Sequence, residues 1–285
     1  MLILWCSVSV AQTDSLFRAQ DLCNQKRFEE AIKVIDRAIV DPQTNSDPFS
    51  WHLRSFAYLH SYKSKGQNNT AYLNLLDTSL ASAIISNKLD NTGEYKDNNR
   101  NFIKNASIIY YKLCSTFLQD SLNNEKSLVF YEKYKKATLL IDPEFNMKAK
   151  DIEYYSATGA IFSELYINKN FDPKYGDIAK SSLLKVLEMD PKNIKANLNL
   201  GVLYYNQGAT LMRQMDYDVD LSQLDVIQEN AKKLFKQSLP FMTKVYELNP
   251  EDKRVLEGLQ GIYYSLNDFD KSNEFKQKLE AQNQR

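Results

Sequence analysis

The chain has 285 residues, 43% of them hydrophobic, and its 36 basic residues are balanced by 36 acidic ones. A balanced chain lacks the basic surface expected of a nucleic-acid-binding protein, and no run of Lys or Arg is long enough to indicate binding to an anionic membrane surface. Only eight glycines and seven prolines interrupt the sequence, and β-branched alternation is nowhere sustained, so the composition predicts an all-α fold.

The first segment, residues 1–11, is apolar and ends in Ser9-Val10-Ala11 before Gln12. Small residues at this spacing are typical of a signal-peptidase site, so we expect a signal peptide and export, to the periplasm or out of the cell. The segment is too short to span a bilayer as a helix, which argues against stable membrane insertion. It lacks the usual basic leader, so we expect the true start codon to lie upstream. The alternative is an apolar N-terminus without a targeting role.

Six segments downstream share one helical pattern, most legible as Asn197-x-x-Leu200-Gly201-x-x-Tyr204. The pattern starts at a first residue, Asn197 in this segment, and has Leu or another residue three positions later and a small residue four positions later. An aromatic or large apolar residue follows seven positions after the first. We expect paired helices to touch at the small residue. That position holds Ala19, Ser55, Cys114, Gly159, Gly201 and, in the last segment, Gln260.

Second helices are indicated by residues spaced by four and then three, which lie on one helical face. Four of them are predicted to end at a proline, because proline lacks the amide hydrogen and restricts the residue before it. The sets are Ala31-Ile35-Ala38, Leu76-Leu80-Ala83, Phe130-Tyr134-Ala137, Ala179-Leu183-Val186 and Ser238-Met242-Val245, and the terminators are Asp41-Pro42, Asp142-Pro143, Asp190-Pro191 and Asn249-Pro250.

The combined pattern resembles the tetratricopeptide repeat family over nearly the whole chain, and with the N-terminal segment it resembles exported envelope members from Gram-negative bacteria. The resemblance implies a right-handed α-solenoid, or superhelix, of about six helix pairs with a C-terminal capping helix. We expect one solenoid over residues 12–285, with repeats near 12–45, 46–90, 101–143, 149–191, 194–250 and 253–282.

Two repeats are longer than the family length of about 34 residues. In the second repeat, polar residues 63–69 and 87–101 predict loops. In the fifth, residues 209–230 lack proline and glycine, so we expect lengthened helices with a turn near Asp216 to Asp220. Pro240 is predicted to kink the second helix of that repeat. In the last helix, Lys276 occupies a position where a large apolar residue is expected, which is typical of a solvated cap.

The chemistry-bearing residues do not assemble into a recognisable active site. Cys23 and Cys114 lie two repeats apart, too far for a disulfide, so we expect free thiols. His52 and His60 flank Phe56 on one helix face, but eight residues span about 12 Å, too far for the two rings to share one metal ion. No Walker loop, Gly-x-Ser-x-Gly elbow or His-Glu-x-x-His motif occurs. We therefore predict no enzyme, no cofactor and no metal.

The family resemblance also implies a concave surface built from defined positions of the first helices. Large residues at these positions predict a groove that binds an extended or helical peptide; the alternative is that they are buried between repeats. The groove positions hold neither the Lys nor the Asn that would clamp a carboxylate terminus, which argues against a tail-clamping co-chaperone. The candidates are His52, Phe56, Leu59, Tyr111, Leu118, Leu198, Val202, Tyr205 and Tyr264.

These observations favour a non-enzymatic protein- or peptide-binding scaffold of the cell envelope that acts through an apolar and aromatic groove. The alternative is a structural or assembly subunit of a larger envelope complex, docking through the convex face and the two insertions. A third class, a carbohydrate or small-ligand binder, depends only on Tyr111, Tyr205 and Tyr264.

Overall fold

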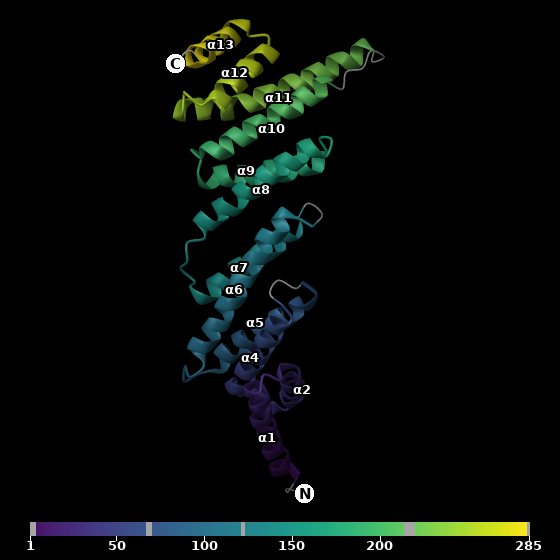
Figure 1. Ribbon diagram of the computed structural model, residues 1–285, viewed down its shortest axis with the longest axis vertical. Helices are drawn as coiled ribbons and strands as arrows, with labels where there is room; N and C mark the ends of the chain where they lie inside the picture. The colour runs from purple at the N-terminus through teal and green to yellow at the C-terminus, as the bar shows by residue number, and fades with distance from the viewer. Residues whose placement is uncertain (1–3, 67–69, 121–122, 214–219, 284–285) are drawn as a thin grey trace. The chain divides into compact units, whose positions relative to one another are not determined.

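The computed structural model describes residues 4–66, 70–120, 123–213 and 220–283, and within them it contains helices and no strand. The all-α prediction is confirmed. The chain divides into two compact units, residues 1–145 and 146–285 (Figure 1). Each unit is a stack of helix pairs.

The first unit holds three helix pairs. Helix α1 packs on α2, α4 on α5, and α6 on α7, while contacts of α2 with α4 and of α5 with α6 join the pairs. The bounds are α1 (Leu4–Asn24), α2 (Phe28–Ala38), the single turn α3 (Pro42–Asn45), α4 (Pro48–Ser64), the 3₁₀ turn η1 (Thr70–Tyr72), α5 (Leu73–Leu89), α6 (Lys96–Gln119) and α7 (Lys126–Ile141).

The second unit also holds three helix pairs, in which α8 packs on α9, α10 on α11 and α12 on α13. The described residues therefore contain the six predicted helix pairs, while the single superhelix over residues 12–285 stays a prediction. The bounds are α8 (Lys148–Asn168), α9 (Pro173–Met189), α10 (Ile194–Arg213), α11 (Leu221–Leu248), α12 (Lys253–Ser265) and α13 (Phe269–Asn283).

Paired helices touch at the predicted small residues. A Cβ atom added to Gly201 of α10 would lie 2.8 Å from Met242 Cγ of α11, and one added to Gly159 of α8 would lie 2.6 Å from Leu183 Cγ of α9. Both distances are shorter than carbon atoms tolerate without displacement, so these helices approach too closely for a side chain. Ala19 and Cys114 are buried at the equivalent position of other pairs.

In three pairs a serine of the second helix also donates a hydrogen bond to the backbone at this contact. A helical carbonyl oxygen has two lone pairs, so it can accept a hydroxyl in addition to its helical N–H. The bonds run from Ser79 Oγ to the Ser55 oxygen (2.8 Å), from Ser238 Oγ to the Gly201 oxygen (2.6 Å) and from Ser272 Oγ to the Gln260 oxygen (3.0 Å).

Carboxylates of second helices connect successive pairs in the first unit. Asp36 of α2 accepts a hydrogen bond from the Tyr58 hydroxyl of α4 at 2.7 Å. Asp77 of α5 accepts one from the Tyr110 hydroxyl of α6 at 2.6 Å, and it also pairs with Lys133 of α7. Tyr110 is fully buried, so Asp77 satisfies a phenol that has no access to water.

The proline terminators are confirmed at three of four sites. Helices α7, α9 and α11 end one residue before Asp142-Pro143, Asp190-Pro191 and Asn249-Pro250. The fourth differs, because α2 ends at Ala38 and Asp41-Pro42 instead begins α3. There the Asp41 carboxylate accepts the Gln43 N–H, and proline fits the first helical position because its missing N–H would be unpaired.

The insertions are more helical than predicted in the second repeat and as helical as predicted in the fifth. Residues 87–89 belong to α5 and 96–101 to α6, so only 90–95 form the junction. The predicted loop 87–101 is therefore wrong over most of its length, because its two ends belong to α5 and α6. Its polar residues in α6 are mostly exposed, and the buried one, Asn99, is hydrogen-bonded to Ser86 Oγ. Lengthened helices in the fifth repeat are confirmed by the 28-residue α11, which runs through Pro240. Most of the predicted turn, 216–219, lies outside the described residues, and the kink stays a prediction.

The C-terminal helix α13 has a different apolar face from the predicted one. Phe275 and Leu279 are buried in the core of the second unit, together with Ser272, whereas Lys276 is exposed. The large apolar residue of this helix is Phe275, directly before Lys276, so the position expected from the sequence pattern was one residue too late.

Replacing Gly201 by Leu should lower the free energy of unfolding of the second unit by ~1–3 kcal/mol, because the new side chain must displace Met242. Thermal and urea denaturation, followed by circular dichroism, measure the change. Val202→Leu at the neighbouring exposed position is the control and should leave stability unchanged. An unaltered transition in Gly201→Leu would contradict the assigned contact between α10 and α11.

Candidate peptide-binding surface

Seven half-buried rings form a continuous row in the first unit, here called the ring stripe. Neighbouring ring centroids lie between 4.2 and 6.3 Å apart. Helix α4 supplies four of them at spacings of three, four and four, which place them on one helical face. The ring stripe consists of Phe28, Phe49, His52, Phe56, His60, Tyr95 and Phe102.

A buried relay of hydrogen bonds determines the tautomer of His52. The Pro48 carbonyl only accepts, so the Ser86 hydroxyl donates its hydrogen to it, at 2.8 Å. Ser86 Oγ then accepts from Asn99 Nδ2 at 2.8 Å, which places Asn99 Oδ1 2.9 Å from His52 Nδ1. Because Oδ1 only accepts, Nδ1 of the neutral imidazole carries the proton and Nε2 keeps its lone pair.

Nε2 of His52 forms no hydrogen bond within the described part of the chain. Its lone pair is therefore left without a hydrogen-bond donor among the described residues. Burial lowers the pKa of His52, although the Asn99 hydrogen bond and the charges of Asp90 and Glu94 act in the opposite direction. Burial and the Lys63 charge lower the pKa of His60. Both rings are thus stabilised in the neutral form.

Asp90 positions the Tyr95 ring of the stripe. This buried carboxylate accepts the backbone N–H groups of Gly93 and Tyr95 at 2.8 Å each and that of Glu94 at 3.2 Å, and it also accepts the Thr92 hydroxyl at 2.9 Å. These bonds fold residues 90–95 into the tight junction between α5 and α6. Tyr95 is thereby placed against His52, with ring centroids 4.9 Å apart.

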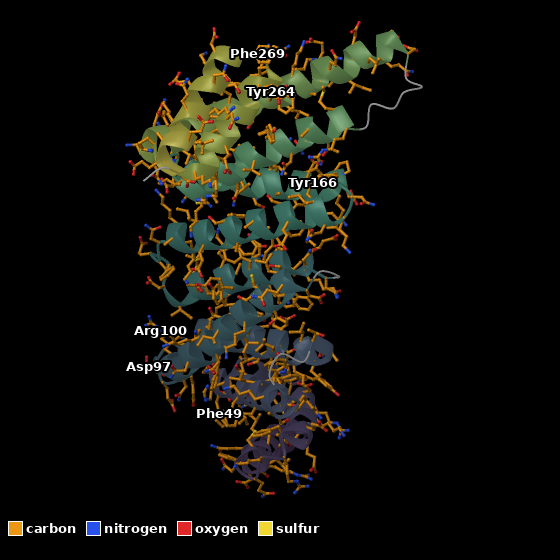
Figure 2. The ribbon with its side chains drawn as sticks, turned by 45° about the horizontal axis from the view of Figure 1, so that its top comes forward. Phe49, Asp97, Arg100, Tyr166, Tyr264 and Phe269 are labelled. Atoms are coloured by element: carbon orange, nitrogen blue, oxygen red, sulfur yellow. The ribbon has the colours of Figure 1, made fainter. Side chains whose placement is uncertain are left out.

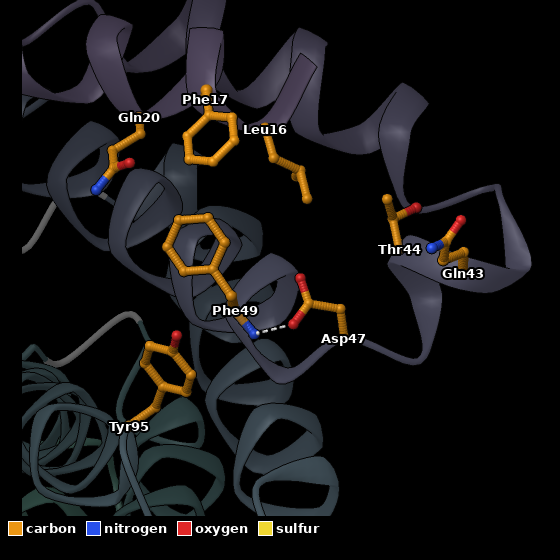
Figure 3. A pocket seen from close by; sticks show the side chains of 8 residues that line it. All are labelled: Leu16, Phe17, Gln20, Gln43, Thr44, Asp47, Phe49 and Tyr95. Carbon is orange, nitrogen blue, oxygen red and sulfur yellow. Dashed lines mark hydrogen bonds between the residues drawn. The ribbon is translucent and has the colours of Figure 1, made fainter. Parts of the chain in front are cut away.

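A surface pocket of about 490 Å³ adjoins the ring stripe, and helices α1, α3 and α4 contribute to it. Figure 3 shows the Phe17 and Phe49 rings pointing toward one another at its opening, with Asp47 beside them. Phe17 is 58% exposed and Leu16 is buried. The lining residues are Leu16, Phe17, Gln20, Gln43, Thr44, Asp47, Phe49 and Tyr95.

The predicted groove residues of the first unit separate into two groups. His52 and Phe56 belong to the ring stripe. Leu59 and Leu118 are buried in the core, so they offer no surface to a ligand. Tyr111 is half-buried and packs on Tyr134, with centroids 4.9 Å apart.

The predicted groove residues of the second unit do not form a comparable row. Leu198 is buried, and Tyr205 is half-buried against Phe235, with centroids 5.5 Å apart. Val202 is exposed, as is Tyr264, whose ring packs edge-on against Phe269. Figure 2 labels Tyr264 and Phe269 in the second unit. Tyr205 and Tyr264 thus pair with different partners.

Sequence reasoning missed five aromatic contributors to the ring stripe and pocket, and it also missed the polar pocket residues Gln43, Thr44 and Asp47. The five aromatic residues are Phe17, Phe28, Phe49, Tyr95 and Phe102. A signal existed for Phe49, which lies three residues before His52 on the same helix. No local signal existed for Tyr95 or Phe102, because their positions depend on how the 90–95 junction and α6 pack against α4.

The cysteines and the helices agree with the absence of a disulfide and of a membrane span within the described residues. Cys23 and Cys114 are free thiols, as predicted, and both are buried. Burial raises the pKa of the Cys23 thiol to about 11. Within the described residues, every helix is too short or too polar to cross a membrane. The same residues contain no group of three or more His, Cys, Asp or Glu side chains suited to a metal ion.

No protein-family model and no curated protein sequence matches the chain. Three solved structures are similar to this chain. PilW, a type IV pilus biogenesis factor, is 14% identical over 95% of this chain and 93% of its own, with a TM-score of 0.35, and a tetratricopeptide repeat protein from Parabacteroides merdae is 14% identical over 95% of this chain and 92% of its own, with a TM-score of 0.26. A monomeric IFIT1 mutant with Gppp-AAAA is 16% identical over 89% of this chain and 46% of its own, with a TM-score of 0.41. At these identities and TM-scores, none of their activities extends to this chain.

Both histidines should titrate below the ordinary value of about 6.5. The unfolded chain then binds more protons than the folded chain just below pH 6.5, so the free energy of unfolding should fall as the pH is lowered through that value. NMR of the two imidazoles, assigned with His52→Gln, measures the pKa values, and urea denaturation measures stability.

Neutral His52 should also show its proton on Nδ1 in ¹H–¹⁵N correlation spectra. The variant His52→Gln/His60→Gln is the control and should lose the pH dependence of stability just below pH 6.5. An Nε2-protonated ring would contradict the relay, whereas titration at or above that value would contradict the dominant effect of burial on the pKa.

Proposed function

We propose that the chain is a non-enzymatic scaffold of the cell envelope that binds a protein or peptide through the ring stripe and the adjoining pocket. The observation that carries this proposal is the row of seven half-buried rings beside an open pocket. Rings that were needed only for stability would be enclosed, whereas half-exposed rings held in place by their neighbours are typical of binding anchors.

The two features supply complementary interactions. The ring stripe offers apolar area with little side-chain freedom left to lose, because each ring already contacts another. His52 Nε2 adds a hydrogen-bond acceptor, and Asp47 adds a charge at the pocket. A few polar groups in an apolar surface are the usual arrangement for recognising a peptide with defined orientation.

Export is supported by the apolar segment 1–11 and its small residues before Gln12. Cleavage there would leave residues 12–24 of α1, which include the buried Leu16, Ala19 and Leu22. N-terminal sequencing of the mature protein tests this: a chain beginning at Gln12 supports export, and an intact segment 1–11 argues against it.

Docking through the fifth-repeat insertion is the second candidate function. Val226, in the lengthened part of α11, is 60% exposed although it is a large apolar residue. Single exposed apolar residues are common on protein surfaces, so Val226 is a probe of contact by the insertion and not evidence for it. The assembly-subunit alternative is favoured if the insertion, and not the pocket, captures the partner.

Replacing Phe17 by Ser should reduce partner capture at least about fivefold, because a central aromatic anchor contributes more than 1 kcal/mol to binding. The measurement is quantitative cross-linked capture from an envelope fraction with the full chain as bait. Val129→Ser is the matched control, since Val129 of α7 is 56% exposed and lies away from the pocket.

Equal capture by Phe17→Ser and the unaltered chain would argue against the pocket. A loss confined to Val226→Ser would transfer the function to the insertion. Circular dichroism should be the same for all three variants because each side chain is largely exposed.

A further inference from the structure

The pocket beside the ring stripe contains aromatic rings and one charge. Phe17, Phe49 and Tyr95 contribute the rings, and Asp47 is the charged residue among the eight that line it. None of these eight is basic. The combination of exposed ring surface and an unneutralised carboxylate is unusual for a site that binds purely apolar groups.

Asp47 is fixed in place and still has acceptor capacity. It caps the N-terminus of α4, where its Oδ1 accepts the Phe49 N–H at 3.0 Å and its Oδ2 accepts the Ser50 hydroxyl at 3.1 Å. A carboxylate can accept about four hydrogen bonds, so each oxygen retains a free lone pair. Figure 3 shows the carboxylate at the border of the pocket, close to the Phe49 backbone.

Two further carboxylates, those of Asp90 and Glu94, lie near Tyr95, although neither lines the pocket. Burial, a hydrogen bond to Glu94 and the charges of Glu94, Asp47 and Asp90 together raise the pKa of the Tyr95 phenol to about 12. Asp47 is the carboxylate that lines the pocket itself, and it attracts a cation and repels an acidic side chain there.

We infer that the pocket binds the side chain of an arginine or lysine from an extended partner peptide, with its aliphatic stem against Phe17 and Phe49 and its cationic head at Asp47. The inference rests on the proposed function and names its ligand class. Basic side chains fit because their stems cover apolar surface, their heads interact with ring faces, and a carboxylate pairs with them by charge-assisted hydrogen bonds.

The test starts with selection of random heptapeptides displayed on phage against the immobilised full chain, in parallel with Asp47→Asn. Asparagine keeps the N-cap and removes the charge. Asp172→Asn is the matched control, because Asp172 precedes Pro173 and caps α9 through the Lys174 N–H just as Asp47 precedes Pro48 and caps α4. Selected peptides are then synthesised with a fluorescent label, and their binding is measured by anisotropy.

The expected result is enrichment of Arg or Lys at one peptide position on the unaltered chain and on Asp172→Asn, and its loss on Asp47→Asn. The labelled peptide should bind Asp47→Asn roughly tenfold more weakly, as expected for one charge-assisted hydrogen bond, and binding should weaken with added salt.

Two outcomes would overturn the inference but still support binding at the pocket. In the first, the selected peptides are apolar or acidic, and Phe17→Ser weakens their binding. In the second, the peptides are basic and Phe17→Ser weakens their binding, but Asp47→Asn binds them as tightly as the unaltered chain does. Peptides that bind Phe17→Ser as well as the unaltered chain would overturn both. Light scattering measures the molar mass of the chain as its concentration is raised. A dimer that forms at high concentration and is abolished by Phe17→Ser would overturn the inference, because a second copy of this chain would then occupy the pocket.

Discussion

The close approach of two helices at a small residue is the constraint on which the rest of this structure depends. Gly159 and Gly201 leave no room for a Cβ atom against Leu183 and Met242. Where the position is Ser55, a serine from the partner helix donates to its carbonyl. Because one face of each first helix is held in this way, the remaining faces are left to contact the next pair or to meet a ligand.

The candidate binding surface is built mainly by polar groups that hold aromatic ones. Packing alone would not keep half-buried rings in one orientation, but the Pro48–Ser86–Asn99 relay fixes the His52 ring, and Asp90 fixes the junction that carries Tyr95. Fully satisfied buried polar groups of this kind confer specificity of conformation more than stability. The ring stripe is therefore ordered before any ligand binds, which reduces the entropy lost on binding.

Much of the fold could be predicted from the sequence because repeated local patterns encode it. Apolar spacing revealed the six pairs, and proline marked three helix ends. The errors share one cause, since polarity and proline are ambiguous signals. Residues 96–101 are polar because most of them are exposed at the start of α6, while the buried Asn99 is hydrogen-bonded to Ser86. Pro42 begins a helix because the first helical position needs no N–H.

The sequence by itself determined the helix pairs and two of the four rings that α4 contributes to the candidate site, His52 and Phe56, because helical periodicity depends only on neighbours along the chain. Only the tertiary structure decided which predicted groove residues are accessible. Leu59, Leu118 and Leu198 are buried, and Phe17, Phe28, Tyr95 and Phe102 come from other segments to complete the surface. Accessibility and contact between distant segments depend on how helices pack, and packing is a property of side-chain shapes summed over several elements.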